Sequence, residues 1–273
     1  QQFYHRAGDF YPALRRNTFR IISVTWKAMI ITTEAVILRA IRYGDSSKIV
    51  TVFTRDHGRI SVIAKGALGN KPRFGAALEL MALSAIVYYH KESRDVQTLS
   101  HADAINTFRG LQSDGRRLVL GFAVIEYIHA VIHGGEQHRE LFMLLVKTLG
   151  ALDTATRNSV NILMRFLVDF CSELGFSLDT SHCTRCRVDL HDETATGAAM
   201  ILAVNEGAFA CPKCATKIPG TPVSSQIFKG LQWLRDVDFS SLETLTITPA
   251  GARETLRILH HYIASHVQDL RTI

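Results

Sequence analysis

Two Cys-x-x-Cys pairs constrain this chain more than any other feature of its sequence. Cys183 and Cys186 form the first pair, Cys211 and Cys214 form the second, and 24 residues separate them. Zinc in structural sites takes four tetrahedral ligands, and cysteines spaced two residues apart on a turn supply them in pairs. The intervening segment is long enough for a β-hairpin that turns at residues 205–207. The pattern therefore predicts a four-cysteine zinc ribbon that holds one structural Zn²⁺ per chain.

The number of cysteines argues against a secreted disulfide framework. Five is an odd count, and a chain of 273 residues can build a hydrophobic core without cross-links. An iron–sulfur cluster would also use four thiolates and stands as the alternative to zinc. The fifth cysteine, Cys171, lies in an apolar run, where we expect a core thiol rather than a ligand.

A zinc deaminase is an enzymatic alternative for the same segment. Such enzymes combine His-x-Glu with a later Pro-Cys-x-x-Cys, and this chain has His191 and Glu193 ahead of Cys211. Its proline, however, lies inside the second cysteine pair, and the first pair would have no role. Four cysteines instead close the coordination shell, and the sequence lacks a phosphate loop, a nucleophile elbow and a His-Glu-x-x-His motif. We therefore expect a structural metal and no enzymatic activity.

The net charge of +6 is unevenly distributed along the chain. Residues 1–110 hold 16 basic and 8 acidic residues, whereas residues 111–273 hold 15 and 17. A local positive field attracts polyanions such as nucleic acid. No apolar run approaches the roughly 18 residues of a membrane span, so we expect no integral membrane protein and no membrane partner.

The first part of the chain has the pattern of β-strands separated by turns. Five runs rich in Val, Ile and Leu are strand candidates: 34–42, 48–55, 59–65, 78–90 and 95–108. Five short strands of this kind are typical of a small closed barrel or a sandwich. Residues 1–28 precede this pattern, and Met29 resembles a natural chain start, so we interpret 1–28 as an N-terminal extension. An Arg-rich transit peptide is the alternative for this segment.

From residue 113 the apolar spacing becomes helical. The expected helices are 114–133, 137–152, 159–174, 224–237 and 249–270. The predicted organisation is α+β and multidomain, and it divides the chain as follows: extension 1–28, barrel domain 29–110, helical domain 111–179 and 223–273, and inserted zinc-binding module 180–222.

Cationic side chains at strand ends and in one loop of the barrel are candidates for phosphate contacts. Neutralised phosphates release counterions, which supplies sequence-independent affinity. The candidate DNA-binding residues are Arg39, Arg42, Lys48, Arg59, Lys65, Lys71 and Arg73. Tyr43 and Phe74 lie beside glycines in loops and are candidates for stacking on unpaired bases, whereas Phe53 fits the core by its pattern.

Several of these segments together resemble the RecO family of bacterial recombination mediators. The resemblance rests on EAVILR at 34–39, YGDSSKIVTVFT at 43–54, GRISVIAKGA at 58–67, and FCSELGF at 170–176 ahead of the first cysteine pair. It covers about residues 30–270. The family also has members without the cysteines, so the resemblance does not make zinc essential to a shared activity.

The resemblance implies an N-terminal five-stranded OB-fold β-barrel, a central helical domain and a zinc element. It also implies a mediator that binds single- and double-stranded DNA, anneals complementary strands, and with RecR helps to load RecA onto DNA coated by the single-stranded-DNA-binding protein. The acidic C-terminal tail of that coating protein is an expected ligand of the helical domain. The implied location is the bacterial cytoplasm, at the nucleoid.

A second class of function fits the same features. A zinc ribbon beside a basic barrel could also be a scaffold that binds RNA or transcription factors. Competition between DNA and RNA distinguishes the two classes where a protein reads the 2′-hydroxyl.

Overall fold

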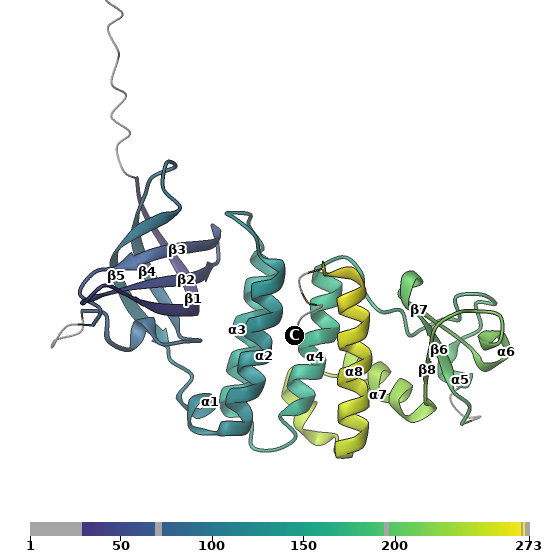
Figure 1. Cartoon of the computed structure of the whole chain (residues 1–273). Helices are drawn as coiled ribbons and strands as arrows, with labels where there is room; N and C mark the ends of the chain where they lie inside the picture. Colours follow the sequence, from purple (N-terminus) through teal and green to yellow (C-terminus); the bar gives the residue numbers. More distant parts are fainter. Residues whose placement is uncertain (1–28, 69–72, 194–196, 269, 271–273) are drawn as a thin grey trace, which may run out of the picture.

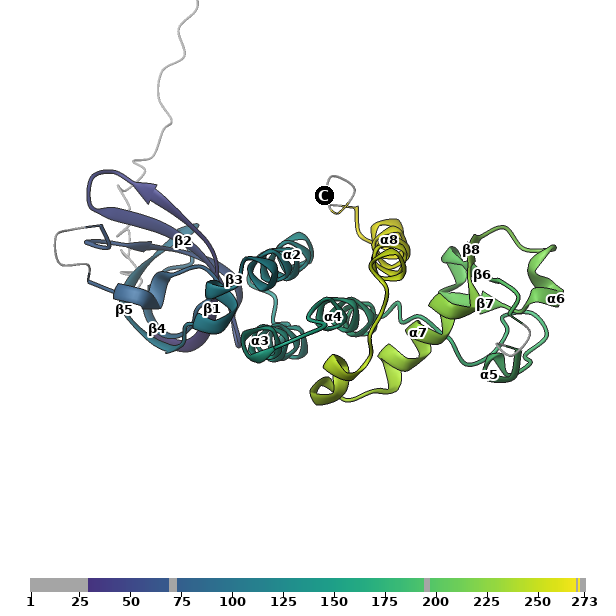
Figure 2. The ribbon, with the colours of Figure 1, turned by 90° about the horizontal axis from the view of Figure 1, so that it is seen from below.

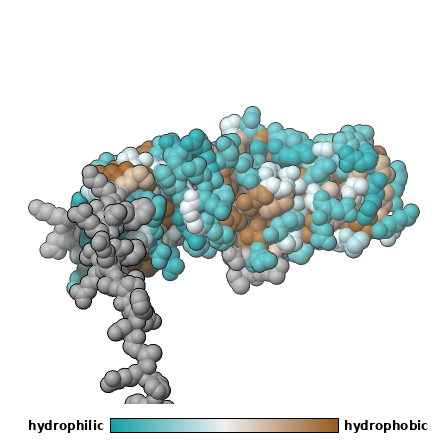
Figure 3. Space-filling view, turned by 90° about the horizontal axis from the view of Figure 1, so that it is seen from above, coloured by the Kyte–Doolittle hydropathy of each residue, from teal (hydrophilic) through white to brown (hydrophobic). Residues whose placement is uncertain are grey.

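The computed structural model describes residues 29–68, 73–193, 197–268 and 270. Three units lie in a row: a β-barrel at one end, a group of helices in the middle, and a small sheet with the cysteines at the other end (Figure 1). The expected extension 1–28 and the candidate Lys71 lie outside the described residues. On the face seen from above, most of the surface is hydrophilic and an apolar patch lies over the helices (Figure 3).

The N-terminal unit is a closed barrel of five strands rather than a sandwich. Its strands are β1 (Met29–Tyr43), β2 (Ser47–Thr54), β3 (Gly58–Ala64), β4 (Leu83–His90) and β5 (Val96–Asn106). They follow the order β1-β2-β3-β5-β4, and β1 closes the barrel by pairing with both β2 and β4. Only β3 and β5 pair in parallel; the other pairs are antiparallel.

Alternation along the strands separates the barrel interior from its outer wall. Val50, Val52 and Val62 are buried in the barrel core, whereas Phe53 belongs to the core of the helices. A 3₁₀ turn, η1 (Gly75–Leu78), covers one end of this interior together with Phe74.

Two expectations about this region were wrong. Residues 78–82 do not belong to a strand, because the chain forms η1 and a turn before β4 begins at Leu83. Apolar spacing alone did not separate that short cap from a strand. Phe74 is only 6% exposed and packs in the barrel core, so it is not a stacking platform for bases.

The middle unit is helical, as the spacing predicted. Its elements are α1 (Arg109–Ser113), α2 (Gly115–Val131), α3 (Arg139–Thr154), α4 (Val160–Glu173), α7 (Ser225–Asp236), η4 (Phe239–Thr244) and α8 (Pro249–His266). Thr248 caps α8 by accepting a hydrogen bond from the backbone N–H of Gly251, with Pro249 in the first turn. Among the described residues, no helix has both the length and the apolar character needed to cross a bilayer.

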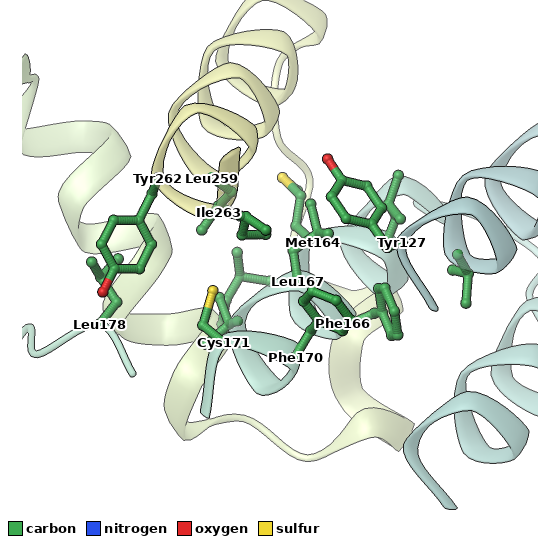
Figure 4. Packing of buried hydrophobic residues seen from close by; sticks show 14 of the residues in the cluster. Tyr127, Met164, Phe166, Leu167, Phe170, Cys171, Leu178, Leu259, Tyr262 and Ile263 are labelled. Atoms are coloured by element: carbon green, nitrogen blue, oxygen red, sulfur yellow. The ribbon is translucent and has the colours of Figure 1, made fainter. Parts of the chain in front are cut away.

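Helix α4 lies at the centre of this unit, between α3 on one side and α7 and α8 on the other (Figure 2). Its buried face includes Met164, Phe166 and Phe170, which pack with Tyr127 of α2 and Ile263 of α8 (Figure 4). Cys171 lies in the same packing and is fully buried. Burial raises the pKa of its thiol to about 12, so Cys171 is an unreactive core residue.

The third unit contains the predicted hairpin and shares the helical core. Strands β6 (Met200–Ala203) and β7 (Ala208–Ala210) pair around η3 (Val204–Glu206), and β8 (Thr221–Val223) adds a third strand on the other side of β6. Short helices α5 (Leu190–Glu193) and α6 (Pro212–Ala215) complete it. The ring of Phe209 lies 4.8 Å from that of Phe228 on α7, so hydrophobic packing continues from the helices into this unit.

The barrel contacts the helices through packing, an ion pair and close backbone approach. The rings of Phe53 and Phe142 meet edge to face at 5.6 Å, and Arg139 forms an ion pair of 2.6 Å with Asp56. The turn between β2 and β3 also touches the loop after α2. A Cβ atom on Gly58 would lie 2.2 Å from the carbonyl oxygen of Glu136.

The close approach at Gly58 predicts a position-dependent cost for adding one methyl group. Gly58 and Gly44 both have φ of +62°, but nothing lies within 4 Å of a Cβ on Gly44. We expect Gly44→Ala to lower the free energy of unfolding by about 1 kcal/mol through backbone strain. Gly58→Ala adds a steric clash and lowers it by about 2 kcal/mol more. Chemical denaturation of both variants measures the difference, and equal costs would contradict this junction.

Candidate functional site

The four paired cysteines meet at one point of the third unit. The sulfur atoms of Cys183, Cys186, Cys211 and Cys214 all lie within 4.8 Å of one another. The sulfurs of Cys186 and Cys211 are 3.7 Å apart. Tetrahedral zinc with bonds of about 2.3 Å separates its sulfur ligands by about 3.8 Å. The arrangement fits a metal ion of this kind before any rearrangement.

Backbone hydrogen bonds build the two turns that carry the cysteines. In the first turn, the N–H of Arg187 donates to the carbonyl oxygen of Cys183, and Arg187 itself has φ of +60°. In the second, Cys211 precedes α6, and the N–H of Cys214 donates back to the carbonyl oxygen of Cys211. The N–H of Thr184 donates to the carbonyl oxygen of Phe209 on β7, which fixes the first turn against the hairpin.

The surroundings of the four cysteines favour the thiolate form of Cys183 over that of Cys214. Burial, the largest influence on Cys183, opposes its ionisation, but the backbone N–H groups of Cys186, Cys211 and Arg185 donate toward it. Together these hydrogen bonds lower the pKa of Cys183 to about 6. The neighbouring Cys186 thiol contributes most to raising the pKa of Cys214 to about 12. A divalent cation is what would hold all four as thiolates.

Neighbouring side chains do not extend this cluster. Among the described residues, the only group of three or more cysteine, histidine or acidic side chains close enough to share a metal is the four cysteines. Glu193 lies on α5 and forms an ion pair of 3.4 Å with Lys213. Arg185 likewise forms an ion pair of 3.1 Å with Glu206.

The structure divides the candidate DNA-binding residues into two groups. The first group, here called the basic barrel end, comprises Arg42, Lys48, Lys65 and Arg73. Arg42 and Lys48 are direct partners across β1 and β2, and Lys48 in turn faces Ala64, the residue before Lys65. The N–H of Arg73 donates to the carbonyl oxygen of Gly66. Four cations therefore gather at the end of the barrel near η1.

These cations are available to a ligand. Within the described part of the chain, none of the four forms an ion pair with a carboxylate. The Nε of Arg42 donates to the carbonyl oxygen of Gly44, and Arg73 donates to that of Ser100 and lies 5.4 Å from the ring of Phe74. Tyr43, at the end of β1, is 55% exposed and stays a candidate for base stacking.

The second group, Arg39 and Arg59, lies on the wall of the barrel that faces α2. Arg39 lines a groove of about 400 Å³ with Phe122 and His129 of α2, and this groove was not predicted from the sequence. Burial lowers the pKa of His129, and the positive charges of Arg59 and Arg39 lower it further. Both arginines therefore lie close to His129, where the carboxylate of Glu126 acts against their charge, and they are apart from the basic barrel end.

The comparisons with known proteins cover nearly all of the described chain. Residues 29–108 match the family model described as Recombination protein O N terminal, and residues 112–272 match Recombination protein O C terminal.

Similar proteins include the DNA repair proteins RecO of Chloroherpeton thalassium and Salinibacter ruber. The first is 32% identical over 89% of this chain and 95% of its own length, and the second is 30% identical over 88% and 89%. The DNA repair protein RecO of Desulfatibacillum aliphaticivorans is 32% identical over 87% of this chain and 92% of its own length.

The structure defines a class of protein that combines a small β-barrel, a helical unit and a four-cysteine module. One continuous hydrophobic core connects the three units. The family models match the two halves of this arrangement in order. The chain belongs to the RecO family.

The cysteine geometry predicts about one zinc ion per chain. Elemental analysis of the purified protein measures this directly. Cys211→Ser is expected to remove the metal and loosen the β6–β7 hairpin, since Cys211 is buried at the centre of the cluster. Cys171→Ala serves as the control, because Cys171 lies in the helical core and its replacement leaves the zinc content unchanged. A folded, metal-free protein with four titratable thiols would refute the site.

Proposed function

We propose that this chain is a DNA repair and recombination mediator that binds single- and double-stranded DNA and anneals complementary strands. The observation that carries the proposal is the basic barrel end, a cluster of cations without carboxylate partners in the described chain. The strand order of the closed barrel, with its parallel β3–β5 pair, supports an OB-fold. Membership of the RecO family supports a role in repair.

Annealing requires neutralised phosphates on two strands and no bond cleavage. The basic barrel end would hold one strand by its backbone, because Lys and Arg contacts to phosphate do not depend on sequence. Arg59 lies outside the groove beside α2 and offers a separate cation for a second strand. Exposed Tyr43 would stack on an unpaired base.

We further propose that the chain works with RecR to load RecA onto DNA coated by the single-stranded-DNA-binding protein, in the bacterial cytoplasm at the nucleoid. In this proposal Zn²⁺, held by Cys183, Cys186, Cys211 and Cys214, has a structural role. The centre lies at the opposite end of the molecule from the barrel, which supports a role in folding rather than in DNA contact (Figure 1).

The groove beside α2 suits the acidic C-terminal tail of the coating protein. Phe122 is 41% exposed there, and Leu38, Leu80 and Ile125 line the same groove. Arg39 lines the same groove and offers a cation to the carboxylates of an acidic peptide.

Reversing the charge of three residues at the basic barrel end tests the DNA contact. We expect the combined change Arg42→Glu, Lys48→Glu and Lys65→Glu to weaken binding of single-stranded DNA and to flatten its salt dependence. The slope of log affinity against log salt concentration falls by about 0.7 for each phosphate that the protein no longer neutralises, so by about 2 in total. Fluorescence anisotropy of labelled single-stranded DNA at several salt concentrations measures this slope.

The control for this experiment reverses three exposed cations elsewhere in the chain, namely Lys217, Lys229 and Arg253. Their reversal should leave the slope unchanged. An unchanged slope in the barrel variant would move the DNA site away from the basic barrel end. Competition by RNA of the same sequence, if stronger than that by DNA, would favour the RNA-binding scaffold instead.

The proposed tail groove predicts a contrast between two exposed residues of α2. Phe122→Ser should weaken binding of a labelled acidic C-terminal tail peptide about tenfold, because it removes an aromatic ring that lines the groove. Val119→Ser is the control, since Val119 is 66% exposed on the same helix and does not line the groove. Equal affinities for the two variants would place the tail elsewhere.

A further inference from the structure

The end of the barrel opposite η1 is open and contains a cavity of about 600 Å³, here called the barrel-mouth pocket. The starts of β1, β3 and β5 and the end of β4 surround it, and Gly134 and Gly135 from the loop after α2 form one side. Pockets for small ligands are commonly about 300–1,000 Å³ and often occupy barrel mouths. The basic barrel end lies at the other end of the same strands, so the pocket is a separate feature.

Tyr88 of β4 is the central residue of this pocket. It is only 1% exposed, and its hydroxyl makes no hydrogen bond to any described residue. Its ring lies edge to face between the imidazoles of His57 and His90, at 6.4 and 6.3 Å. Burial raises the pKa of Tyr88 to about 12, so the hydroxyl keeps its proton and can donate it in a hydrogen bond.

The other residues that line the pocket include apolar, basic and acidic side chains. Ile31 and Met29 supply apolar surface, Arg59 supplies a cation, and Asp95 supplies a carboxylate acceptor. Gln97 also borders the pocket, but its amide is already used by backbone groups of Lys91 and Arg94. By contrast, the hydroxyl of Tyr88 is free for a ligand.

We propose that the barrel-mouth pocket holds one nucleotide of a bound DNA strand, with its base against Ile31 and within reach of the Tyr88 hydroxyl, and its phosphate against Arg59. This inference rests on the proposed DNA-binding function and names a specific subsite for it. His57 and His90 stand beside the base and add aromatic surface.

The mixed lining favours a nucleotide over a simple anion. A carboxylate such as Asp95 repels a bare phosphate but accepts hydrogen bonds from the amino edge of a base. Apolar and aromatic walls contribute nothing to phosphate binding, whereas bases stack on or pack against them. A nucleotide is the ligand that uses all three kinds of group.

Arg59 connects the pocket to the rest of the DNA surface. It lines the barrel-mouth pocket, and its charge, like that of Arg39, acts on His129 at the wall near α2. A strand that follows this wall would therefore approach the barrel mouth at Arg59. The nucleotide in the pocket would be one that is unpaired, since a base in a duplex is stacked and shielded.

Two neighbouring tyrosines provide a matched test. Tyr88→Phe removes only the hydroxyl in the pocket, and Tyr89→Phe removes the hydroxyl of the next residue, which points to the opposite face and is 41% exposed. We expect Tyr88→Phe to weaken binding of single-stranded DNA by about three- to tenfold, as expected for the removal of one hydrogen bond. Tyr89→Phe should bind like the parent chain. Equal affinity of the two variants would overturn the proposal.

Photocrosslinking gives an independent readout with the unmodified full chain. An oligonucleotide with one 5-iododeoxyuridine is irradiated in complex with the protein, and the crosslinked peptide is identified by mass spectrometry for each position of the label. A crosslink to Tyr88, His57 or His90 supports the pocket. Crosslinks confined to other residues would overturn the pocket but leave DNA binding intact, whereas an absence of DNA binding in the parallel titration would contradict both proposals.

Discussion

Hydrophobic packing along α4 is the interaction on which the arrangement of the whole molecule depends. One continuous core joins Phe53 on the outer wall of the barrel, Phe166 and Phe170 of α4, and Phe209 beside the cysteines. Burial of these aromatic rings supplies most of the free energy that holds each unit against the next. Because the barrel and the cysteine module each share this core, their positions are set by packing rather than by flexible linkers. The ion pair between Arg139 and Asp56 and the close approach at Gly58 then fix the orientation of the barrel.

This arrangement separates the four-cysteine cluster from the cationic surfaces of the barrel. In the proposed function, a metal held by the four cysteines stabilises a module too small to build a large core of its own. The cations lie on the barrel, at the basic barrel end and along the wall near α2. In the proposed function, one strand and a partner's acidic tail can therefore occupy different parts of the molecule. The barrel-mouth pocket, at the other end of the barrel from the basic barrel end, would add a subsite for an unpaired nucleotide.

Local patterns in the sequence were sufficient to predict much of this fold. The spacing of the cysteines anticipated a cluster and a hairpin between the pairs, and the turn at Gly58 separated β2 from β3 as expected. Features that depend on distant residues were missed or misjudged. Phe74 was expected to be an exposed loop aromatic but packs in the barrel core. The sequence also did not show that Arg39 and Arg42, both candidate DNA contacts, lie on different surfaces of the barrel. The residues that line the barrel mouth come from four strands, so no single stretch of the sequence predicts the pocket.

In the proposed function, the cations of the barrel let this chain join complementary strands without cleaving a bond. The decisive measurement is annealing of complementary oligonucleotides coated with the single-stranded-DNA-binding protein, with and without RecR, and without a nucleoside triphosphate. We expect rapid annealing by the parent chain and little or no annealing when the charges of Arg42, Lys48 and Lys65 are reversed. Annealing by that variant at the parent rate, or no annealing by the parent chain, would contradict it.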